Sequence, residues 1–349
     1  MKRMKALIGV LLILISISLS GCADTDISSE EGKNQIEDAD TISIGMCFDS
    51  FVIERWEKDR DIFVATARDL GADVNVQNAN GEAEEQVRQI EYFTEKGVDA
   101  IVIICIDSES IQDAVKKAKS RGIKIIAYDR MISMADVDLY VSFDNEMVGC
   151  LMAEALNSAE IEKPKVIMLQ GPNTDNNVSL VRQGFTKICG RNGMDVIASM
   201  NADQWKAENA ADYLEENSEL LEEADGIMCG NDNVATAVVR VLSEKRKAGK
   251  IMLVGQDADL EACQRIVEGT QNMTVYKPVE AEAKEAAKTT VALIKGEKID
   301  NLNYLSDGRY EVPSIILEPI AVTKDNIDSV IIDSGFHLKD EVYLNVQRK

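Results

Sequence analysis

Short apolar runs alternate with amphipathic segments from residue 41 almost to the end of the chain. Several runs are apolar throughout, which is typical of parallel strands that are buried on both faces of a sheet. We expect strands at residues 42–48, 72–77, 99–105, 123–128, 165–170, 195–199, 226–229 and 250–255. We expect helices at residues 56–71, 82–97, 109–122 and 233–249. This order predicts an α/β fold with two doubly wound parallel-sheet lobes that no long linker separates.

Three of the expected helices end at a glycine, namely Gly71, Gly97 and Gly122. A residue just past a helix end commonly adopts a left-handed conformation, which glycine tolerates best. We therefore expect a positive φ at all three positions.

The N-terminal segment has a different pattern from the rest of the chain. Basic residues at 2–5 precede an apolar run at residues 6–17, which is too short to span a bilayer and indicates a signal peptide at 1–21. The tetrapeptide LSGC at residues 19–22 resembles the lipobox of bacterial lipoproteins, which implies cleavage before Cys22 and a diacylglycerol on its sulfur. An ordinary signal peptide with a cysteine there by chance is the alternative. Residues 23–40 are polar and acidic, so we expect a flexible tether.

Charge and cysteine content narrow the functional classes. The formal net charge is −23, with 38 basic and 61 acidic residues, and such a surface repels nucleic acid. The chain has seven cysteines. Apart from Cys22 they form no CxxC pair, and several lie in strand-like runs, so we interpret them mainly as small buried residues. Disulfides remain an alternative for an exported protein.

Polar or charged side chains follow six apolar runs in succession. They are Arg55 with Trp56, Asp129 with Arg130, Asn176 with Arg182, Asn231 with Asp232, Gln256 with Asp257, and Lys277. In doubly wound sheets, ligands bind beyond the carboxyl ends of the strands, where these residues lie. Each has a simpler explanation, because Asp and Asn are preferred helix N-caps and a lone Arg or Lys is commonly a solvated surface charge. Carboxylates, amides and cations repeated at equivalent places favour a ligand site.

The two tryptophans of the chain, Trp56 and Trp205, both occur near these clusters. A sugar hydroxyl both donates and accepts hydrogen bonds, and the amide, carboxylate and guanidinium groups provide both functions. The C–H faces of a pyranose can lie against aromatic rings, so two tryptophans from opposing lobes could hold one between them. Packing in the core is the alternative for both residues.

Few features of the sequence indicate an enzyme. The single histidine, His337, lies far from the clusters, and there is no GxSxG, HExxH, GxxxxGK[ST] or strand-following GxGxxG motif. Paired carboxylates can hydrolyse glycosides, but here each carboxylate neighbours an amide or a cation, which favours stable hydrogen bonding. We expect no catalysis, no metal and no cofactor.

The chain resembles the periplasmic-binding-protein-type sugar receptors of ABC transporters over nearly all of residues 42–337. The segments that carry the resemblance are ERWEKDRDIF, VQNANG, AYDRMI, SFDNEMVG, DNN, NDN, GQDADL, GTQNMTVYKP, VPS and GFH. YDR or GQDA alone would be general to pentose and hexose receptors. ERWxKDRDIF together with YDRMI and GTQxMTVYKP is more specific.

The resemblance implies roles for individual residues. Trp56 and Trp205 are expected to stack on the sugar. Hydrogen bonds to it are expected from Arg55, Asp129, Arg130, Asn176, Arg182, Asn231, Asp257 and Lys277. The adjacent Asn177 is an alternative to Asn176, since the register is open by one residue. Asp232 either contacts the sugar or caps the following helix.

The resemblance also implies a type I periplasmic binding protein fold, whose chain crosses a hinge between lobes three times. We expect crossings near Asn145, near Lys277 and near residues 307–312. Residues 41–145 and 277–307 would then form one lobe. Residues 146–276 and 308–337 would form the other.

The expected function is that of a monomeric, lipid-anchored receptor outside the cytoplasm. It would close on a monosaccharide, with an aldopentose favoured, and deliver it to an ABC permease and its ATPase. Residues 47–53 and 172–177 depart from the aldopentose pattern, so another pentose or a hexose is an alternative. Three rival functions are a receptor that feeds a chemoreceptor or sensor kinase, an extracellular sugar enzyme, and the effector domain of a repressor. The repressor would need an N-terminal helix-turn-helix.

Overall fold

The computed structural model describes residues 41–157 and 161–346. The expected signal peptide, Cys22 and tether lie outside the described residues. Within the described part of the chain, no helix is both long enough and apolar enough to cross a membrane.

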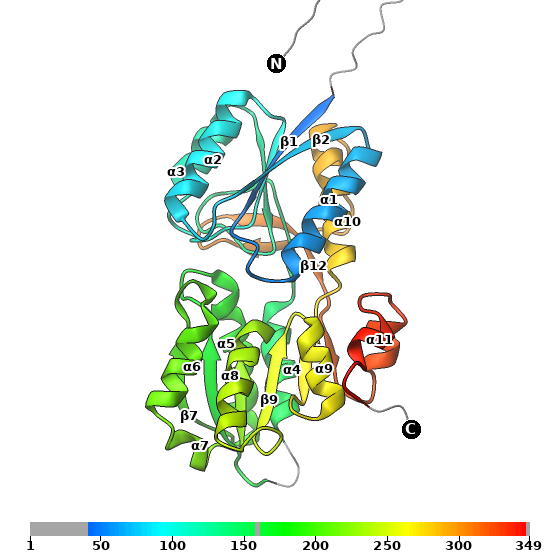
Figure 1. Ribbon diagram of the computed structural model, residues 1–349. Coiled ribbons are helices and arrows are strands. Elements are labelled where there is room, and N and C mark those ends of the chain that lie inside the picture. Colours follow the sequence, from blue (N-terminus) through cyan, green and yellow to red (C-terminus); the bar gives the residue numbers. More distant parts are fainter. Residues whose placement is uncertain (1–40, 158–160, 347–349) are drawn as a thin grey trace, which may run out of the picture. The chain divides into compact units, whose positions relative to one another are not determined.

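Two sheets with flanking helices make up the body of the protein (Figure 1). The strands of the first sheet lie in the order β11-β12-β5-β4-β3-β1-β2. They are β1 (Ile42–Phe48), β2 (Ala72–Asn78), β3 (Ala100–Ile103), β4 (Lys124–Tyr128), β5 (Leu139–Phe143), β11 (Asn303–Ser306) and β12 (Glu311–Leu317). All neighbouring strands pair in parallel except β11 and β12, which form an antiparallel pair at the edge.

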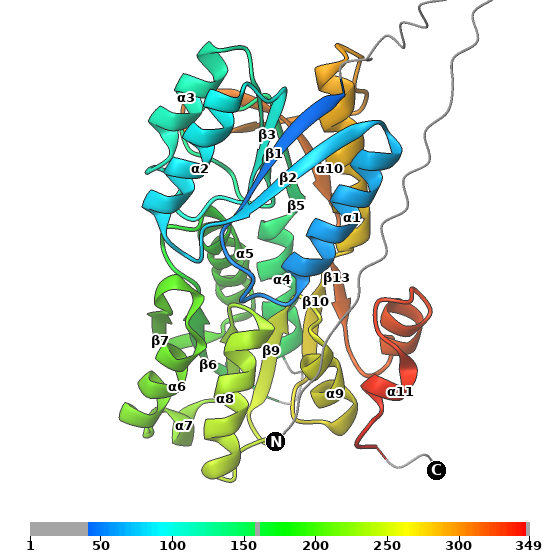
Figure 2. The same ribbon diagram turned by 45° about the horizontal axis from the view of Figure 1, so that its top comes forward.

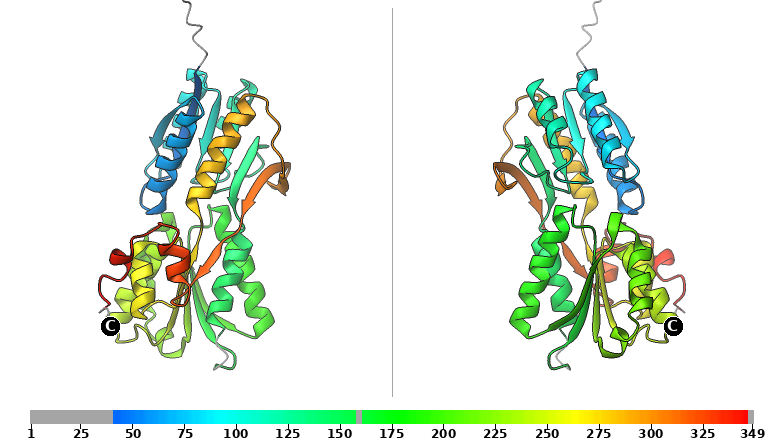
Figure 3. Two further views of the ribbon diagram at one scale, coloured as in Figure 1. Left: turned by 90° about the vertical axis from the view of Figure 1, so that its right-hand side faces the viewer. Right: turned by 90° about the vertical axis from the view of Figure 1, so that its left-hand side faces the viewer.

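Four helices cover the two faces of the first sheet. They are α1 (Arg55–Asp69), α2 (Ala83–Lys96), α3 (Gln112–Ser120) and α10 (Val279–Ile294). Helices α1 and α10 lie side by side on one face, although more than 200 residues separate them in the chain (Figures 1 and 3). Helices α2 and α3 pack on the opposite face. Both faces of the central strands are therefore buried, as their continuous apolar runs predicted.

The second sheet has the order β13-β10-β9-β8-β6-β7. Its strands are β6 (Lys165–Gln170), β7 (Asp195–Asn201), β8 (Gly226–Cys229), β9 (Met252–Gln256), β10 (Met273–Tyr276) and β13 (Ile320–Val322). The pairs are parallel except β10 with β13. Around it lie α4 (Asn145–Leu156), α5 (Asn176–Asn192), a 3₁₀ turn (Asp203–Trp205), α6 (Ala207–Glu216), α7 (Leu220–Glu223), α8 (Asp232–Glu244), α9 (Leu260–Glu268), a π-helix (Asp328–Ile332) and α11 (Lys339–Val342). Together the two sheets confirm the predicted doubly wound α/β class.

Helices α4 and α5 pack closely on one face of the second sheet (Figure 2). A Cβ on Gly149 would lie 1.9 Å from the carbonyl oxygen of Val181, and a Cβ on Gly184 would lie 1.9 Å from that of Glu146. Only glycine fits at these contacts, so the two residues set how closely the helices approach. This contact lies in the middle of α5, and the first turns of the same helix reach the site described below.

The chain passes between the sheets three times. It leaves the first sheet after β5 and enters α4, and it returns at residues 277–278 between β10 and α10. The third passage lies between β12 and β13, in orange in Figure 3. The expected assignment of residues 308–337 to the second lobe is therefore wrong for β12. Its backbone pairs with β5 from Ser314 with Tyr140 to Leu317 with Phe143, which fixes it in the first sheet.

The local signals agree with the structure at the helix ends. Gly71, Gly97 and Gly122 have φ values of 84°, 70° and 83°, as predicted. The apolar pattern did not identify the strands β5, β11, β12 and β13. Two of these, β11 and β13, form the antiparallel edges of their sheets, where a strand has a neighbouring strand on one side only.

Candidate ligand-binding site

The carboxyl ends of strands from both sheets surround one cavity. It contains about 480 Å³ of space between atoms, part of which is open to solvent. The first lobe and the hinge contribute Ile53, Arg55, Trp56, Asp129, Arg130 and Lys277. The second lobe contributes Gln170, Gly171, Asp175, Asn177, Val178, Val181, Trp205, Met228, Gly230, Asn231, Gln256 and Asp257. The cavity is narrow because side chains already meet across it.

Most of the residues singled out from the sequence lie together in this cavity. Those that line it are Arg55, Trp56, Asp129, Arg130, Asn177, Trp205, Asn231, Asp257 and Lys277. The three that do not line it are Asn176, Arg182 and Asp232. Their placement in the site is therefore corrected.

The geometry of α5 explains two of these corrections. Asn177, Val178 and Val181 line the cavity, and a helix turns about 100° per residue, so these three share one face. Asn176, the first residue of the helix, and Arg182 fall outside that face. Between the two adjacent asparagines, the alternative register is therefore the one that reaches the cavity.

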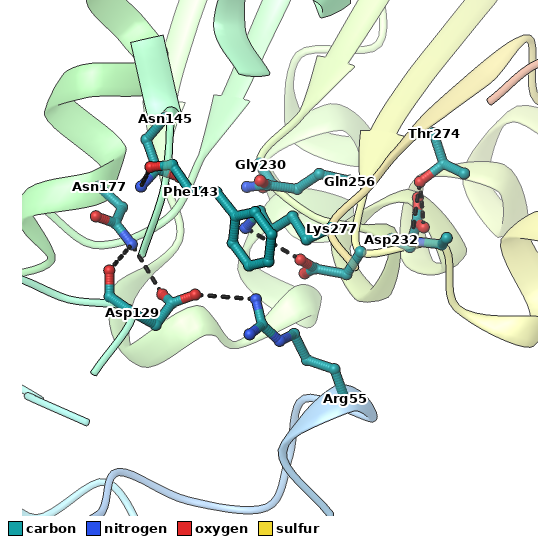
Figure 4. A network of polar contacts seen from close by, with 12 residues as sticks. Arg55, Asp129, Phe143, Asn145, Asn177, Gly230, Asp232, Gln256, Thr274 and Lys277 are labelled. Carbon is teal, nitrogen blue, oxygen red and sulfur yellow. Dashed lines mark hydrogen bonds and ion pairs between the residues drawn. The ribbon is translucent and has the colours of Figure 1, made fainter. Parts of the chain in front are cut away.

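Asp232 serves the structure of the second lobe. Asn231 is the N-cap of α8 and accepts a hydrogen bond from the backbone N–H of Val234 at 2.9 Å. The fully buried carboxylate of Asp232 instead accepts a hydrogen bond from Thr274 at 2.6 Å (Figure 4) and another from Gln271 at 2.8 Å. Burial raises its pKa to about 7. Neither of the two expected roles, ligand contact or helix cap, describes it.

Arg55 is held rigidly at the start of α1. Its Nε and Nη2 donate to both oxygens of Asp59, and Nη2 also donates to Glu282 on α10 at 2.5 Å. Its Nη1 donates to Asp129 at 2.9 Å (Figure 4). A guanidinium has five N–H donors, of which these four bonds leave one for a further partner. The side chain is 2% exposed, so this remaining donor is fixed in a nearly dry environment.

Asp129 joins the two lobes. The amide of Asn177, in the second lobe, donates to the Asp129 carboxylate at 2.9 Å and to its backbone carbonyl at 3.0 Å (Figure 4). Burial alone would raise the pKa of Asp129, but Arg55 and the nearby Lys277 and Arg130 lower it below its usual range. Asp129 is therefore an ionised acceptor at neutral pH.

A second polar connection crosses the lobes at Arg130. Its Nε lies 2.8 Å from the carboxylate of Asp175, the N-cap of α5, and its Nη1 donates to Asp49 at 2.7 Å. The indole N–H of Trp205 also donates to Asp175, at 3.2 Å. Burial raises the pKa of Asp175, an effect that Arg130 partly offsets. Asp175 thus orients an arginine and a tryptophan from opposite sides of the cavity.

Both tryptophans belong to one apolar cluster, although they come from different lobes. The ring of Trp56 lies under the Arg55 guanidinium, 4.5 Å from its centroid, and forms an edge contact with Phe48. Trp205 packs over Gly171, where a Cβ would lie 2.3 Å from the indole. Both rings are therefore packed in the apolar core and also line the cavity.

Six buried polar atoms of the cavity wall have no hydrogen-bond partner among the described residues. They are Trp56 Nε1, Gln170 Oε1, Asn177 Oδ1, Asn231 Nδ2, Gln256 Oε1 and Asp257 Oδ1. The last lies 3.2 Å from Lys277 Nζ, close enough for an ion pair but without hydrogen-bond geometry. Buried polar groups without partners are costly, and the great majority of them in folded proteins are satisfied. Six in one cavity indicate a polar ligand that both donates and accepts.

Backbone strain is concentrated at the same place. Asp129, Trp205 and Asp257 have φ values of 61°, 58° and 96°, in the region that favours glycine. Such conformations are costly and cluster at ligand sites, where the surrounding structure enforces them.

Several cavity residues were not identified from the sequence. Gln256 was noted after its strand without a role, and Asp175 lies in the PNTDNN segment at residues 172–177, where no role was assigned to it. Its position before α5 was a signal for an N-cap, but nothing in the sequence indicated its contacts with Arg130 and Trp205. Gln170 ends a predicted strand, Gly171 and Gly230 directly follow predicted strands, and none of the three carries a signal of its own.

The described residues contain neither a disulfide nor a cluster of metal ligands. The six described cysteines are all unpaired, so the structure contains no disulfide in this part of the chain. No group of three or more His, Cys, Asp or Glu residues within the described ranges could hold a metal ion.

Comparison with known proteins places the chain in a family. A family model described as a periplasmic binding protein domain matches residues 44–298, so the chain belongs to the periplasmic binding protein family. This confirms the resemblance seen in the sequence. The family consists of solute-binding proteins, which are not enzymes.

Individual relatives are similar over most of their length. The D-xylose-binding periplasmic protein of Haemophilus influenzae is 41% identical over 307 residues, which are 86% of this chain and 92% of that protein. The D-xylose-binding periplasmic protein of Escherichia coli is 41% identical over 312 residues, which are 87% and 93% of the two chains. An ABC transporter solute-binding protein from Clostridium phytofermentans, solved with β-D-glucose bound, has a TM-score of 0.78 at 25% identity and covers 86% of this chain and 99% of its own.

Proposed function

We propose that the protein binds a monosaccharide, D-xylose in the first place, in the cavity between its two lobes and delivers it to an ABC permease with its ATPase. It works outside the cytoplasm, anchored to the membrane by lipid on Cys22. No bond of the sugar is made or broken.

The observation that carries the proposal is the group of six unpartnered buried polar atoms around two tryptophan rings. The free donors are Asn231 Nδ2 and the Trp56 N–H, and the free acceptors come from Gln170, Asn177, Gln256 and Asp257. Each hydroxyl of a sugar needs both functions. The apolar faces of the sugar would lie against the indoles, away from water.

The choice of D-xylose rests on two supports. The two relatives at 41% identity are named as D-xylose-binding proteins. A pentopyranose also lacks the hydroxymethyl group of a hexose, which suits a narrow cavity. The solved relative with glucose shows that the fold also accommodates a hexose, so another aldose is the alternative.

Binding favours the closed arrangement because the ligand contacts both lobes. Arg55 and Asp129 come from the first lobe, and Asn177 and Trp205 come from the second. A ligand that bridges them binds the closed form more tightly than the open form and shifts the population toward it. The closed surface is then the form that the permease recognises.

A calorimetric panel of D-xylose, L-arabinose, D-ribose, D-glucose and D-galactose tests the proposal. We expect one-to-one binding with D-xylose tightest and no change in the recovered sugar. Tighter binding of another aldose would refute the choice of sugar. Absence of binding to every aldose would refute the function.

A further inference from the structure

The segment Ser334–His337 contains the motif GFH, for which the proposed function provides no role. It follows the π-helix and packs with α9, β10 and β13 in an apolar cluster of the second lobe. Phe336 is half-buried there, and its ring contacts Tyr276, with a centroid distance of 4.8 Å. Tyr276 ends β10 and directly precedes the hinge residue Lys277.

His337 contacts the turn that carries the cavity residue Asp257. It is 6% exposed, and its Nε2 lies 2.8 Å from the backbone carbonyl oxygen of Ala258. Burial lowers the pKa of His337 to about 4, so the ring is neutral at neutral pH and its Nε2–H donates to this carbonyl. Ala258 and the preceding Asp257 have φ values of 54° and 96°. The histidine thus anchors a strained turn whose Asp257 side chain faces the cavity.

Phe336 contacts the other lobe. The ammonium of Lys58 lies 4.0 Å from the centroid of its ring and donates to the Phe336 carbonyl oxygen at 3.4 Å. Lys58 is on α1, one turn after Arg55, which lines the cavity. A movement of α1 away from the second lobe would separate these groups.

We propose that Phe336 and His337 are positioning residues of the ligand site. His337 holds the Asp257–Ala258 turn in its strained shape, and Phe336 ties the same lobe to α1 through Lys58 when the lobes are closed. The inference rests on the proposed sugar binding, since it assigns these residues to the same site. Neither residue touches the ligand.

The first test concerns His337. We expect His337→Leu to weaken D-xylose binding about fivefold, because it removes one buried hydrogen bond to the turn. His337→Gln, whose amide can replace the Nε2 donor, should restore most of the affinity. If Leu and Gln weaken binding equally, or if neither changes it, the role of His337 is refuted.

The second test concerns the contact between the lobes, measured by stopped-flow tryptophan fluorescence. We expect Lys58→Met and Phe336→Leu each to raise the sugar dissociation rate about two- to fivefold, and the double variant to match the stronger single change. Lys284→Met is the matched control, because Lys284 lines the same hinge-side groove but pairs with Glu280. Additive single effects, unchanged dissociation rates, or an equal effect of the control would refute the coupling.

The two proposals can fail separately. Wild-type protein that binds sugar, with His337→Leu, Lys58→Met, Phe336→Leu and the double variant all unchanged, would overturn only the positioning role. Wild-type protein that binds no aldose would overturn the proposed function, and this inference with it.

Discussion

The Arg130–Asp175 ion pair should stabilise the closed form, and Asp175→Asn tests this. The two groups come from opposite lobes, their side chains are 4% and 2% exposed, and Arg130 Nε lies 2.8 Å from the carboxylate. Asparagine keeps the shape of aspartate, and its one amide oxygen can still cap α5, but its NH₂ group then replaces the oxygen that accepts from the Trp205 indole and pairs with Arg130. The substitution therefore removes the negative charge together with the acceptor that Arg130 and Trp205 share, while the cap of α5 is kept.

The expected loss follows from the partners that remain. Arg130 still donates to the Asp49 carboxylate at 2.7 Å and to the Cys105 carbonyl at 3.0 Å, so the guanidinium is not left without a counter-charge. One hydrogen bond between charged groups contributes about 1.5–3 kcal/mol, which corresponds to a roughly 10- to 150-fold weaker affinity if only the closed form makes it.

Calorimetry with D-xylose and thermal unfolding, measured on the same samples, are the assay. Asp225→Asn is the control, since Asp225 accepts a backbone N–H from Lys165 at 2.8 Å in the second sheet and does not line the cavity. We expect Asp175→Asn to weaken binding while both variants unfold at similar temperatures. An affinity within twofold of wild type, or an equal loss in the control, would refute the reasoning.

Three further predictions concern packing, pH and thiols. Gly171→Ala places a Cβ 2.3 Å from the Trp205 indole, so we expect altered tryptophan fluorescence and at least about tenfold weaker sugar binding; unchanged spectra and affinity would contradict it. Burial raises the pKa of Glu282 well above its usual range, and Arg55 only partly offsets this rise. The contribution of Glu282 to the free energy of unfolding is therefore complete below about pH 4.3 and is lost as pH rises through the raised pKa. Glu282→Gln should flatten this decline in denaturant titrations, and an unchanged pH slope would contradict the assignment. All six described cysteines should react with a thiol reagent in denaturant without reductant, and fewer than six reactive thiols would indicate a disulfide. In the native protein, the partly exposed Cys150 should react first.

The sequence predicted the main elements of the fold because buried parallel strands carry an unmistakable local pattern. The runs at 99–105 and 123–128 contain β3 and β4, since both faces of these strands are covered. The strand β12 was not predicted, because Pro313 and the polar residues around it give no such run. Its partner, β5, is more than 160 residues away, and only the tertiary structure reveals the pairing.

The sequence predicted which strand ends carry the candidate site, but not which side chain at each strand end reaches the cavity. Asn177 and Asn176 have the same chemistry, and the turn of α5 decides which one reaches the cavity. Asp232 follows Asn231 directly, yet its carboxylate turns into the lobe toward Thr274. Adjacent residues point in different directions, so a motif alone cannot distinguish them.

The central claim is that two tryptophans from opposite lobes hold a sugar in one cavity. Calorimetric titration of D-xylose into wild type, Trp56→Ala and Trp205→Ala tests it most directly, with thermal unfolding to confirm that each variant is folded. We predict measurable binding by wild type and a loss of at least about tenfold in each variant. If both folded variants bind D-xylose as tightly as wild type, the sugar does not lie between these rings, and the central claim is wrong.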